Sequence, residues 1–473
     1  MITYEQFIER KSQIGGQSGF EPVWMPEFLF PFQRALCEWA IKKGRAAIFA
    51  DCGLGKTPMQ LVWAENVRRH TNKPVLILTP LAVGAQVCKE GEKFGIEAER
   101  SRDGKPCKNI TVVNYEQLHK YSENDFAGVV ADESSILKHW SGATQKKVTR
   151  FLSKIKFRLL CTATPAPNDF IEMGSSSEAL GELTHSDMLA TFFRQISDDE
   201  KRRKATASDI INSKRLSWRV LQSFGQWALK AHAFDPFWRW VSSWARACRK
   251  PSDVGPFSDG AFVLPKMVRH DHTVVPLTPS EGFLFTIPAF GLNQERGERR
   301  RTLVERSELV ANLTKQSDSA VVWCSLNSEG DILEKAISGS VQVKGSQSVE
   351  EKEERLISFL EGESRVLVTK AKIAGLGINM QHCAHVVCFV DHSWEKFYQC
   401  VRRCWRFGQK REVRLDVIAT EGEVNVKKNM NRKESQASTM FDAIIKSMNH
   451  AQTISTAKPT IKVETPSWLH TNN

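Results

Sequence analysis

The chain has 473 residues, of which 41% are hydrophobic and 25% are charged, and its formal net charge is +12 at pH 7. This length exceeds what one hydrophobic core supports, so we expect two or three domains, and the apolar content excludes an intrinsically disordered chain. The positive charge favours an acidic polymer as partner.

The number of cysteines and the N-terminal residues indicate the cellular compartment of the protein. The eleven cysteines are scattered and odd in number, which predicts reduced intracellular thiols and not a disulfide framework. The first residues, MITYEQFIERK, lack the apolar stretch of a secretory signal. No apolar run approaches the ~20 residues that span a bilayer. We therefore expect a cytoplasmic protein with no membrane partner.

Two series of short apolar runs follow one another along the chain. Each run has the length of a buried strand, and helical patterns such as residues 32–43 and 60–69 separate several of them. Such alternation is typical of parallel sheets with helices on both faces. We therefore predict an α/β protein with two parallel-sheet lobes, whose strands lie at residues 46–50, 75–79, 110–113, 129–131 and 157–161, then 320–324, 341–343, 365–368, 385–390 and 414–418.

The segment between the two series looks helical and is rich in tryptophan. Trp240 and Trp244 are four residues apart, and this helical spacing favours core packing over stacking on nucleic-acid bases. Basic clusters at 201–204 and 299–301 either contact phosphate or form a solvated face. We divide the chain into an N-terminal segment (1–30), a first lobe (31–168), a helical Trp-rich insertion (169–262), a second lobe (263–425) and a polar C-terminal tail (426–473) with an amphipathic stretch near 440–448.

The sequence ADCGLGKT at residues 50–57 has the features of a phosphate-binding loop, because it lies between a predicted strand and a predicted helix. Gly53 and Gly55 permit close approach of phosphate to backbone N–H groups. Lys56 would reach the β- and γ-phosphates and Thr57 would bind Mg²⁺. Ala50 replaces the usual first glycine. This loop predicts ATP as the bound nucleotide, together with Mg²⁺.

Acidic and hydroxyl residues follow two later strands. Asp132 and Glu133 come directly after an apolar run, at the sheet edge where ligands bind. Asp132 could hold Mg²⁺ through water, and Glu133 could orient the attacking water. The turn TATP at 162–165 could hydrogen-bond to this acidic loop, although a Thr-Pro turn requires no function.

These motifs, in this order, resemble helicase superfamily 2 and within it the Swi/Snf-related branch. The overall pattern, with its short Trp-rich middle segment, further resembles a group of phage and prophage helicase-like proteins. The resemblance covers about residues 30–165 and 315–420. Its motifs are the glutamine motif at Phe32-Gln33, motif I (DCGLGKT), Ia (LTPLAV, 78–83), II (VVADESSILK, 129–138), III (LLCTATPAPND, 159–169), IV (321–324), V (GLGINM, 375–380) and VI (QCVRRCWRFGQ, 399–409).

The resemblance implies two RecA-like lobes that close on one ATP. Arg403 and Arg406 would be arginine fingers that reach the γ-phosphate, and Gln399 would contact the nucleotide or its water. Gln33 would read adenine, and Gly377 belongs to the motif V loop that we include in the nucleotide site. Thr79, Thr164 and Thr369 would lie near a nucleic-acid backbone. Motif II reads Asp-Glu-Ser-Ser instead of Asp-Glu-Ala-His, so the residues that usually couple the two lobes are changed.

Together the residues and the resemblance predict an ATP-dependent DNA helicase or translocase, with double-stranded DNA favoured. Two alternatives stay open: an RNA helicase, and a nucleic-acid clamp that ATP switches without directional motion. A zinc site formed by His382, Cys383, His385 and Cys388, followed by Cys400 and Cys404, is less favoured. Residues 386–390 have the pattern of a buried strand, the last two cysteines lie inside motif VI, and the spacing matches no common zinc ligand set.

Overall fold

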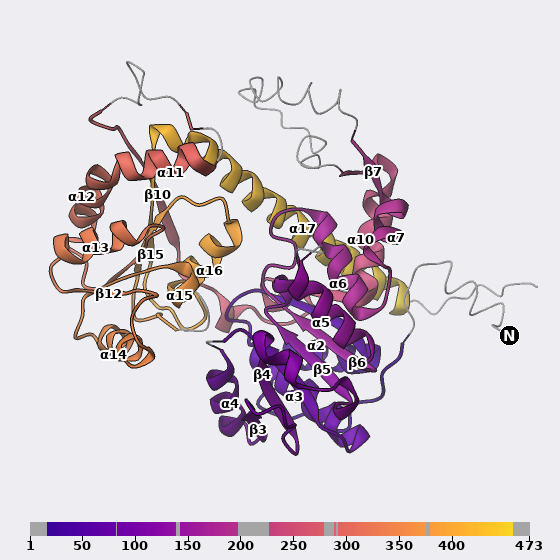
Figure 1. Cartoon of the computed structure of the whole chain (residues 1–473). Helices are drawn as coiled ribbons and strands as arrows, with labels where there is room; N and C mark the ends of the chain where they lie inside the picture. The colour runs from indigo at the N-terminus through magenta and orange to yellow at the C-terminus, as the bar shows by residue number, and fades with distance from the viewer. Residues whose placement is uncertain are drawn as a thin grey trace, which may run out of the picture.

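The computed structural model describes residues 17–81, 83–138, 142–196, 227–278, 288–289, 292–374 and 379–456. These residues form two lobes, one coloured indigo to magenta and one coral to orange, and a long helix passes from the second lobe to the first (Figure 1). Within these ranges, no helix has the length and apolar character needed to cross a membrane.

The first lobe is built on a seven-stranded sheet in which every pairing is parallel. Alternate residues of each strand face opposite hydrophobic cores, as Ile48 and Phe49 do. The strand order is β3 (Ala98–Arg100), β4 (Ile110–Asn114), β2 (Val75–Thr79), β5 (Gly128–Asp132), β6 (Phe157–Cys161), β1 (Arg45–Ala50) and β9 (Ala245–Cys248). One face packs against α2 (Pro31–Lys43), α3 (Lys56–Thr71) and α4 (Gly84–Lys93), and the other against α5 (Ala143–Ser153), α6 (Met173–Leu180), α7 (His185–Phe192) and α10 (Phe234–Trp244).

The second lobe has a parallel sheet of six strands. Their order is β10 (Met267–Val274), β15 (Val413–Thr420), β14 (His385–Phe389), β11 (Ala320–Trp323), β13 (Val366–Thr369) and β12 (Ser340–Val343). The helices around it are α11 (Leu292–Arg301), α12 (Leu303–Thr314), α13 (Asn327–Ala336), α14 (Val349–Leu360), α15 (Ala371–Ala374) and α16 (Trp394–Cys404). The predicted α/β fold with two parallel-sheet lobes is therefore confirmed, and all ten predicted strands form within two residues of their predicted ends.

The prediction that residues 169–262 are helical without strands was wrong in part. β7 (Phe193–Gln195) and β8 (Trp227–Leu229) form a small antiparallel pair, and β9 extends the sheet of the first lobe by pairing with β1. The sequence of β9, ARAC, has no β-branched or aromatic residue, so its strand conformation comes from tertiary pairing and not from propensity.

The tryptophans of this segment pack as predicted. Trp238, Trp240 and Trp244 are at most 3% exposed and belong to the core of the first lobe. Their edge-to-face and stacked contacts with neighbouring phenylalanines and with one another explain this placement, because large aromatic rings bury much apolar area. Trp218 and the basic cluster 201–204 lie outside the described residues.

The predicted polar tail forms most of one long helix, α17 (Val424–Thr456). Val426 and Met430 near its start pack in the core of the second lobe, whereas Met440 and Ile444 pack in the core of the first lobe. At 33 residues the helix is about 50 Å long, which lets it contact both lobes (Figure 1). The amphipathic stretch near 440–448 is thus a packing surface, while the domain limits themselves stay a proposal.

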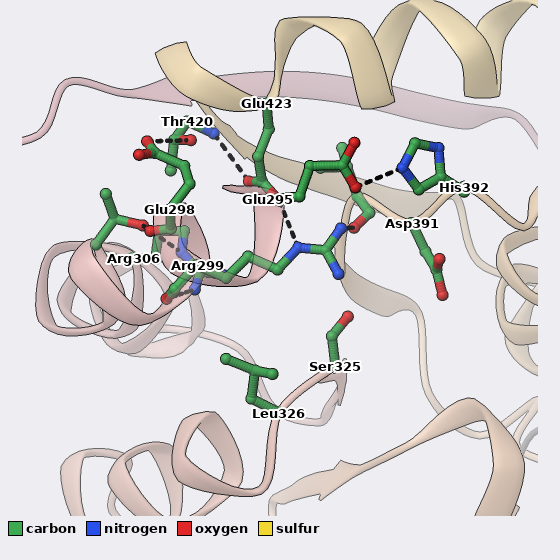
Figure 2. A network of polar contacts seen from close by, with 12 residues as sticks. Glu295, Glu298, Arg299, Arg306, Ser325, Leu326, Asp391, His392, Thr420 and Glu423 are labelled. Carbon is green, nitrogen blue, oxygen red and sulfur yellow. Dashed lines mark hydrogen bonds and ion pairs between the residues drawn. The ribbon is translucent and has the colours of Figure 1, made fainter. Parts of the chain in front are cut away.

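A network of buried charges joins α11, α12 and α13 to the strand ends of the second lobe (Figure 2). Arg299 donates to Glu423 at 2.6 Å and to the carbonyl oxygen of Val390 at 3.0 Å. Arg306 and Glu329 form an ion pair at 2.7 Å, with side chains 1% and 0% exposed. Because each of these charges has a partner, the lobe can bury them without an unpaired ion.

Candidate active site

The predicted nucleotide motifs meet at one edge of the first sheet. The phosphate loop follows β1, the acidic pair ends β5, and the Thr-Ala-Thr turn follows β6. β5, β6 and β1 are neighbours in the sheet, and the carboxyl ends of parallel strands lie at the same edge. The three loops therefore lie together, because each directly follows one of these neighbouring strands.

The phosphate loop adopts a conformation that requires glycine. Gly53 and Gly55 have φ angles of +88° and +75°, in the left-handed region that side chains disfavour. The Nζ atom of Lys56, the first residue of α3, donates to the carbonyl oxygen of Ala50 at 2.9 Å. Burial lowers the pKa of Lys56, but electrostatic interactions with Cys52, Glu133 and other neighbours outweigh it and raise that pKa overall. The lysine is therefore a cation at neutral pH.

Gln33 connects α2 to the phosphate loop. Its side chain accepts from the N–H of Phe30 at 3.0 Å and donates to the carbonyl oxygen of Leu54 at 2.9 Å. A Cβ atom at position 55 would lie 2.2 Å from Gln33 Nε2, so the Gln33 side chain would have to shift to accommodate it. Thr57, next to Lys56 at the start of α3, is half-buried.

The acidic pair is held by hydrogen bonds from three elements. Asp132 accepts from Gln60 Nε2 at 2.6 Å through its carboxylate, and its carbonyl oxygen accepts from the Tyr115 hydroxyl at 2.6 Å. Glu133 accepts from the Thr162 hydroxyl at 3.3 Å and has a left-handed φ of +48°. Such a backbone conformation in a non-glycine residue costs free energy and is concentrated at functional sites.

Burial shifts the pKa values of this acidic pair. It raises the pKa of both Asp132 and Glu133, and the positive charge of Lys56 opposes the shift in each case. For Glu133 the charge of Arg403 opposes it as well. A carboxylate whose pKa lies above its ordinary value is a better proton acceptor for water.

Helix α16 of the second lobe contacts the phosphate loop directly. Arg402 forms an ion pair with Asp51 at 3.0 Å and donates to the carbonyl oxygen of Cys52 at 2.6 Å. The Tyr398 hydroxyl donates to the same Asp51 carboxylate. The lobes are therefore closed on each other at the predicted nucleotide site.

The two predicted finger arginines lie beside this contact. Arg403 is 7% exposed, and in the described part of the chain the Nε atoms of Arg403 and Arg406 are buried without a hydrogen-bond partner. Burial and the charge of Arg403 lower the pKa of Arg406. A buried cationic donor without a partner is costly, and the phosphates of a nucleotide would supply acceptors here. Gln399, on the same helix, is 9% exposed.

Some predicted residues were not brought into the site. Gly377, with the rest of 375–378, lies outside the described residues. Thr79 and Thr369 are at most 1% exposed, and the Thr369 hydroxyl donates to the carbonyl oxygen of Val343 inside the second lobe. Their side chains face the protein interior, and their expected placement beside a nucleic-acid backbone stays a prediction.

Sequence reasoning missed the residues that join the lobes. Asp51, Tyr398 and Arg402 carry the contact at the phosphate loop, and Glu395 contacts Lys138 of the first lobe. A signal was available: Glu395, Tyr398 and Arg402 are spaced i, i+3 and i+7 and so share one face of α16.

The histidine-cysteine cluster that suggested zinc has other roles. His385 Nε2 hydrogen-bonds to Asp416 at 2.6 Å, and its Nδ1 hydrogen-bonds to Ser317 at 2.6 Å. Both ring nitrogens are thus used, and neither is available as a metal ligand. Cys383, Cys388 and the two cysteines of α16 are buried thiols in the core of the second lobe.

We expect Gly53→Ala to lower ATP turnover at least tenfold, because a mispositioned site commonly costs this much or more. A Cβ atom at position 53 would lie 2.9 Å from the backbone nitrogen of Phe407 in the second lobe, so alanine would push the lobes apart. Gly95→Ala is the control, since Gly95 also has a positive φ but nothing within 4 Å. Equal turnover of the two variants in a steady-state assay would refute this steric explanation.

Parts of this chain are similar to known proteins. Residues 304–408 match the family model of the helicase conserved C-terminal domain. The chain is 28% identical over 180 residues, 36% of its length, to a Bacillus subtilis (strain 168) protein named "Putative ATP-dependent helicase/translocase YwqA", and the match spans 19% of that protein. The solved Sulfolobus solfataricus SWI2/SNF2 ATPase core in complex with dsDNA is similar at 15% identity and a TM-score of 0.39, over 89% of this chain and 96% of that one.

Proposed function

We propose that this chain is a helicase of superfamily 2, a nucleic-acid-stimulated ATPase that moves along DNA, with double-stranded DNA favoured over a single strand. The observation that carries the proposal is the placement of α16 against the phosphate loop, with buried, unpartnered donors of Arg403 and Arg406 beside it. Cations supplied from a second lobe would make hydrolysis depend on lobe closure.

Each predicted residue has a role in this proposal. Glu133 orients and activates the attacking water, and Lys56 neutralises the β- and γ-phosphates. Arg403 and Arg406 stabilise the charge that develops on the transferring phosphoryl group. Gln33 contacts adenine, and Gln399 contacts the nucleotide or its water.

The residues present also fit Mg²⁺. The hydroxyl of Thr57 and a carboxylate oxygen of Asp132 are ligands of the hard, oxygen-seeking kind that Mg²⁺ prefers. Asp132 accepts from Gln60 through its Oδ1 atom at 2.6 Å, which holds this carboxylate at the end of β5. When bound, Mg²⁺ neutralises phosphate charge and orients the leaving group.

The choice of track rests on two observations. The net charge of +12 supports a polyanion as partner, and the motif set resembles the Swi/Snf-related branch, whose members often track duplex DNA without separating it. Translocation is therefore better supported than strand separation. A phage or prophage origin stays a prediction.

The alternative of an ATP-switched clamp has less support. A clamp needs nucleotide binding but no activated water, whereas Glu133 and both finger arginines are retained at the site. An RNA helicase would share this ATP site, so the polymer that stimulates hydrolysis has to distinguish the two.

The deciding experiment is steady-state ATP hydrolysis by the wild type and Glu133→Gln, each with and without double-stranded DNA, single-stranded DNA and RNA. We expect stimulation by DNA that is lost in Glu133→Gln, while ATP binding is kept. Stimulation by RNA alone would favour the RNA helicase. If no polymer stimulates a folded, ATP-binding protein, the proposal of an autonomous motor is wrong.

A further inference from the structure

A buried carboxylate of the second lobe contacts two motifs of the first lobe. Glu395, the second residue of α16, is 7% exposed. Its Oε2 atom accepts from Lys138 Nζ, and its Oε1 atom accepts from the Thr164 hydroxyl at 3.5 Å. Lys138 ends the 3₁₀ helix η3 (Ser134–Lys138), which directly follows Glu133. Glu395 thus holds the loops of motif II and motif III together from across the interface.

A chain of hydrogen bonds continues from this carboxylate to the acidic pair. The backbone N–H of Thr164 donates to the Thr162 hydroxyl oxygen at 3.1 Å. The Thr162 hydroxyl donates in turn to Glu133 Oε2 at 3.3 Å. Each link has an available donor and acceptor, so Glu395 is connected to Glu133 through the two threonines, with the hydroxyl and the backbone N–H of Thr164 joined covalently.

The changed residues of motif II do not make this connection. Ser134 is 2% exposed, and in the described part of the chain its hydroxyl has no hydrogen-bond partner. The Ser135 hydroxyl donates at 3.5 Å to the carbonyl oxygen of Glu133, within the first lobe. Both serines therefore face inward, and the contact between motif II and the second lobe is made by Lys138.

We infer that Glu395 is a positioning residue for ATP hydrolysis: when α16 closes on the first lobe, its carboxylate fixes Lys138 and Thr164 and thereby sets the side chain of Glu133. This inference rests on the proposed ATPase and adds to it the residue through which the second lobe reaches the general base. It also explains the Asp-Glu-Ser-Ser sequence, because coupling has moved to Lys138.

The negative charge of Glu395 is needed at this position because its ion pair is largely buried. The pair with Lys138 is largely buried, with side chains 9% and 21% exposed, so removal of one partner leaves the other charge poorly solvated. Loss of Glu395 would therefore release Lys138 towards solvent and free the motif II loop. The nucleotide-binding residues Lys56 and Gln33 do not contact Glu395, so ATP affinity should change little.

The test compares Glu395→Ala, Glu395→Gln and the control Glu353→Ala, which removes an exposed glutamate from α14 of the same lobe. We expect Glu395→Ala to lower polymer-stimulated kcat by ~10- to 100-fold, the usual effect of a misplaced catalytic group, while KM for ATP changes less than about threefold. Glu395→Gln keeps an acceptor for Thr164 but loses the charge for Lys138, so its kcat should be intermediate. The exchange Lys138→Glu with Glu395→Lys should recover part of kcat.

A second measurement works without any polymer or turnover. Amide hydrogen exchange of residues 133–138 and 162–164 should be faster in Glu395→Ala than in wild type, while exchange elsewhere in the first sheet is unchanged. If wild type shows no polymer-stimulated hydrolysis, the proposed function fails, and this exchange still decides the connection. Wild-type exchange together with wild-type kcat in Glu395→Ala, or a loss that Glu353→Ala shares, would overturn the inference.

Discussion

Arg403→Ala is expected to lower ATP turnover by ~10³-fold or more, which is the contribution of an arginine finger to phosphoryl transfer. The reason is that Arg403 is a buried cation beside Glu133, with an Nε donor that has no protein partner in the described residues. Single-turnover hydrolysis measures the chemical step, and a fluorescent ATP analogue measures binding. Binding should fall much less than turnover, because the finger acts mainly on the transition state.

Arg296→Ala is the matched control for this prediction. Arg296 is an exposed arginine of α11 in the same lobe, so its removal changes the net charge equally without reaching the nucleotide site. Arg406→Ala should resemble Arg403→Ala. If Arg403→Ala keeps turnover within about tenfold of the Arg296→Ala value, Arg403 does not act as a finger, since fingers contribute far more.

Glu329→Ala is expected to destabilise the second lobe by ~3–5 kcal/mol, the cost of breaking a buried ion pair on one side. Arg306 would be left 1% exposed and without its carboxylate partner. Glu329 also accepts from the N–H groups of Ser325 and Leu326 at 2.7 and 2.8 Å, so the start of α13 would lose its cap. Urea unfolding followed by a probe in the second lobe measures the shift in midpoint at constant slope.

The control for Glu329 is another ion pair of the same lobe. Glu334 and Arg355 are paired at 2.8 Å, but their side chains are 31% and 38% exposed, so Glu334→Ala should cost less than about 1 kcal/mol. A double change to Arg306→Met and Glu329→Leu should cost less than Glu329→Ala alone, because no buried charge is left unpaired. Equal destabilisation by Glu329→Ala and Glu334→Ala would contradict the prediction.

The features that could be predicted from the sequence are those that depend on residues close together along the chain. The strands were predictable because runs such as Val75–Thr79 are apolar and β-rich and end at turn residues. Lys56 and Glu133 could be assigned to one site because each directly follows a strand, and parallel strands end at a common edge. For these residues a few neighbours along the chain determine the position.

What the sequence could not predict depends on contacts between distant segments. β9 forms only because it pairs with β1, nearly 200 residues earlier. The pair of Arg402 with Asp51 requires the two lobes to meet in one orientation, and nothing near either residue specifies that orientation. The catalytic roles assigned to the site residues stay predictions until turnover is measured.

The long helix α17 has a consequence for the order in which the protein folds. Met440 and Ile444 complete the core of the first lobe, although the strands of that core begin some 400 residues earlier in the chain. During synthesis, the first lobe therefore exposes an apolar surface over α10 until α17 has left the ribosome. Contacts of such long sequence separation form slowly, and exposed apolar surfaces aggregate. A chain that ends before residue 440 should accordingly be recovered mainly as insoluble protein.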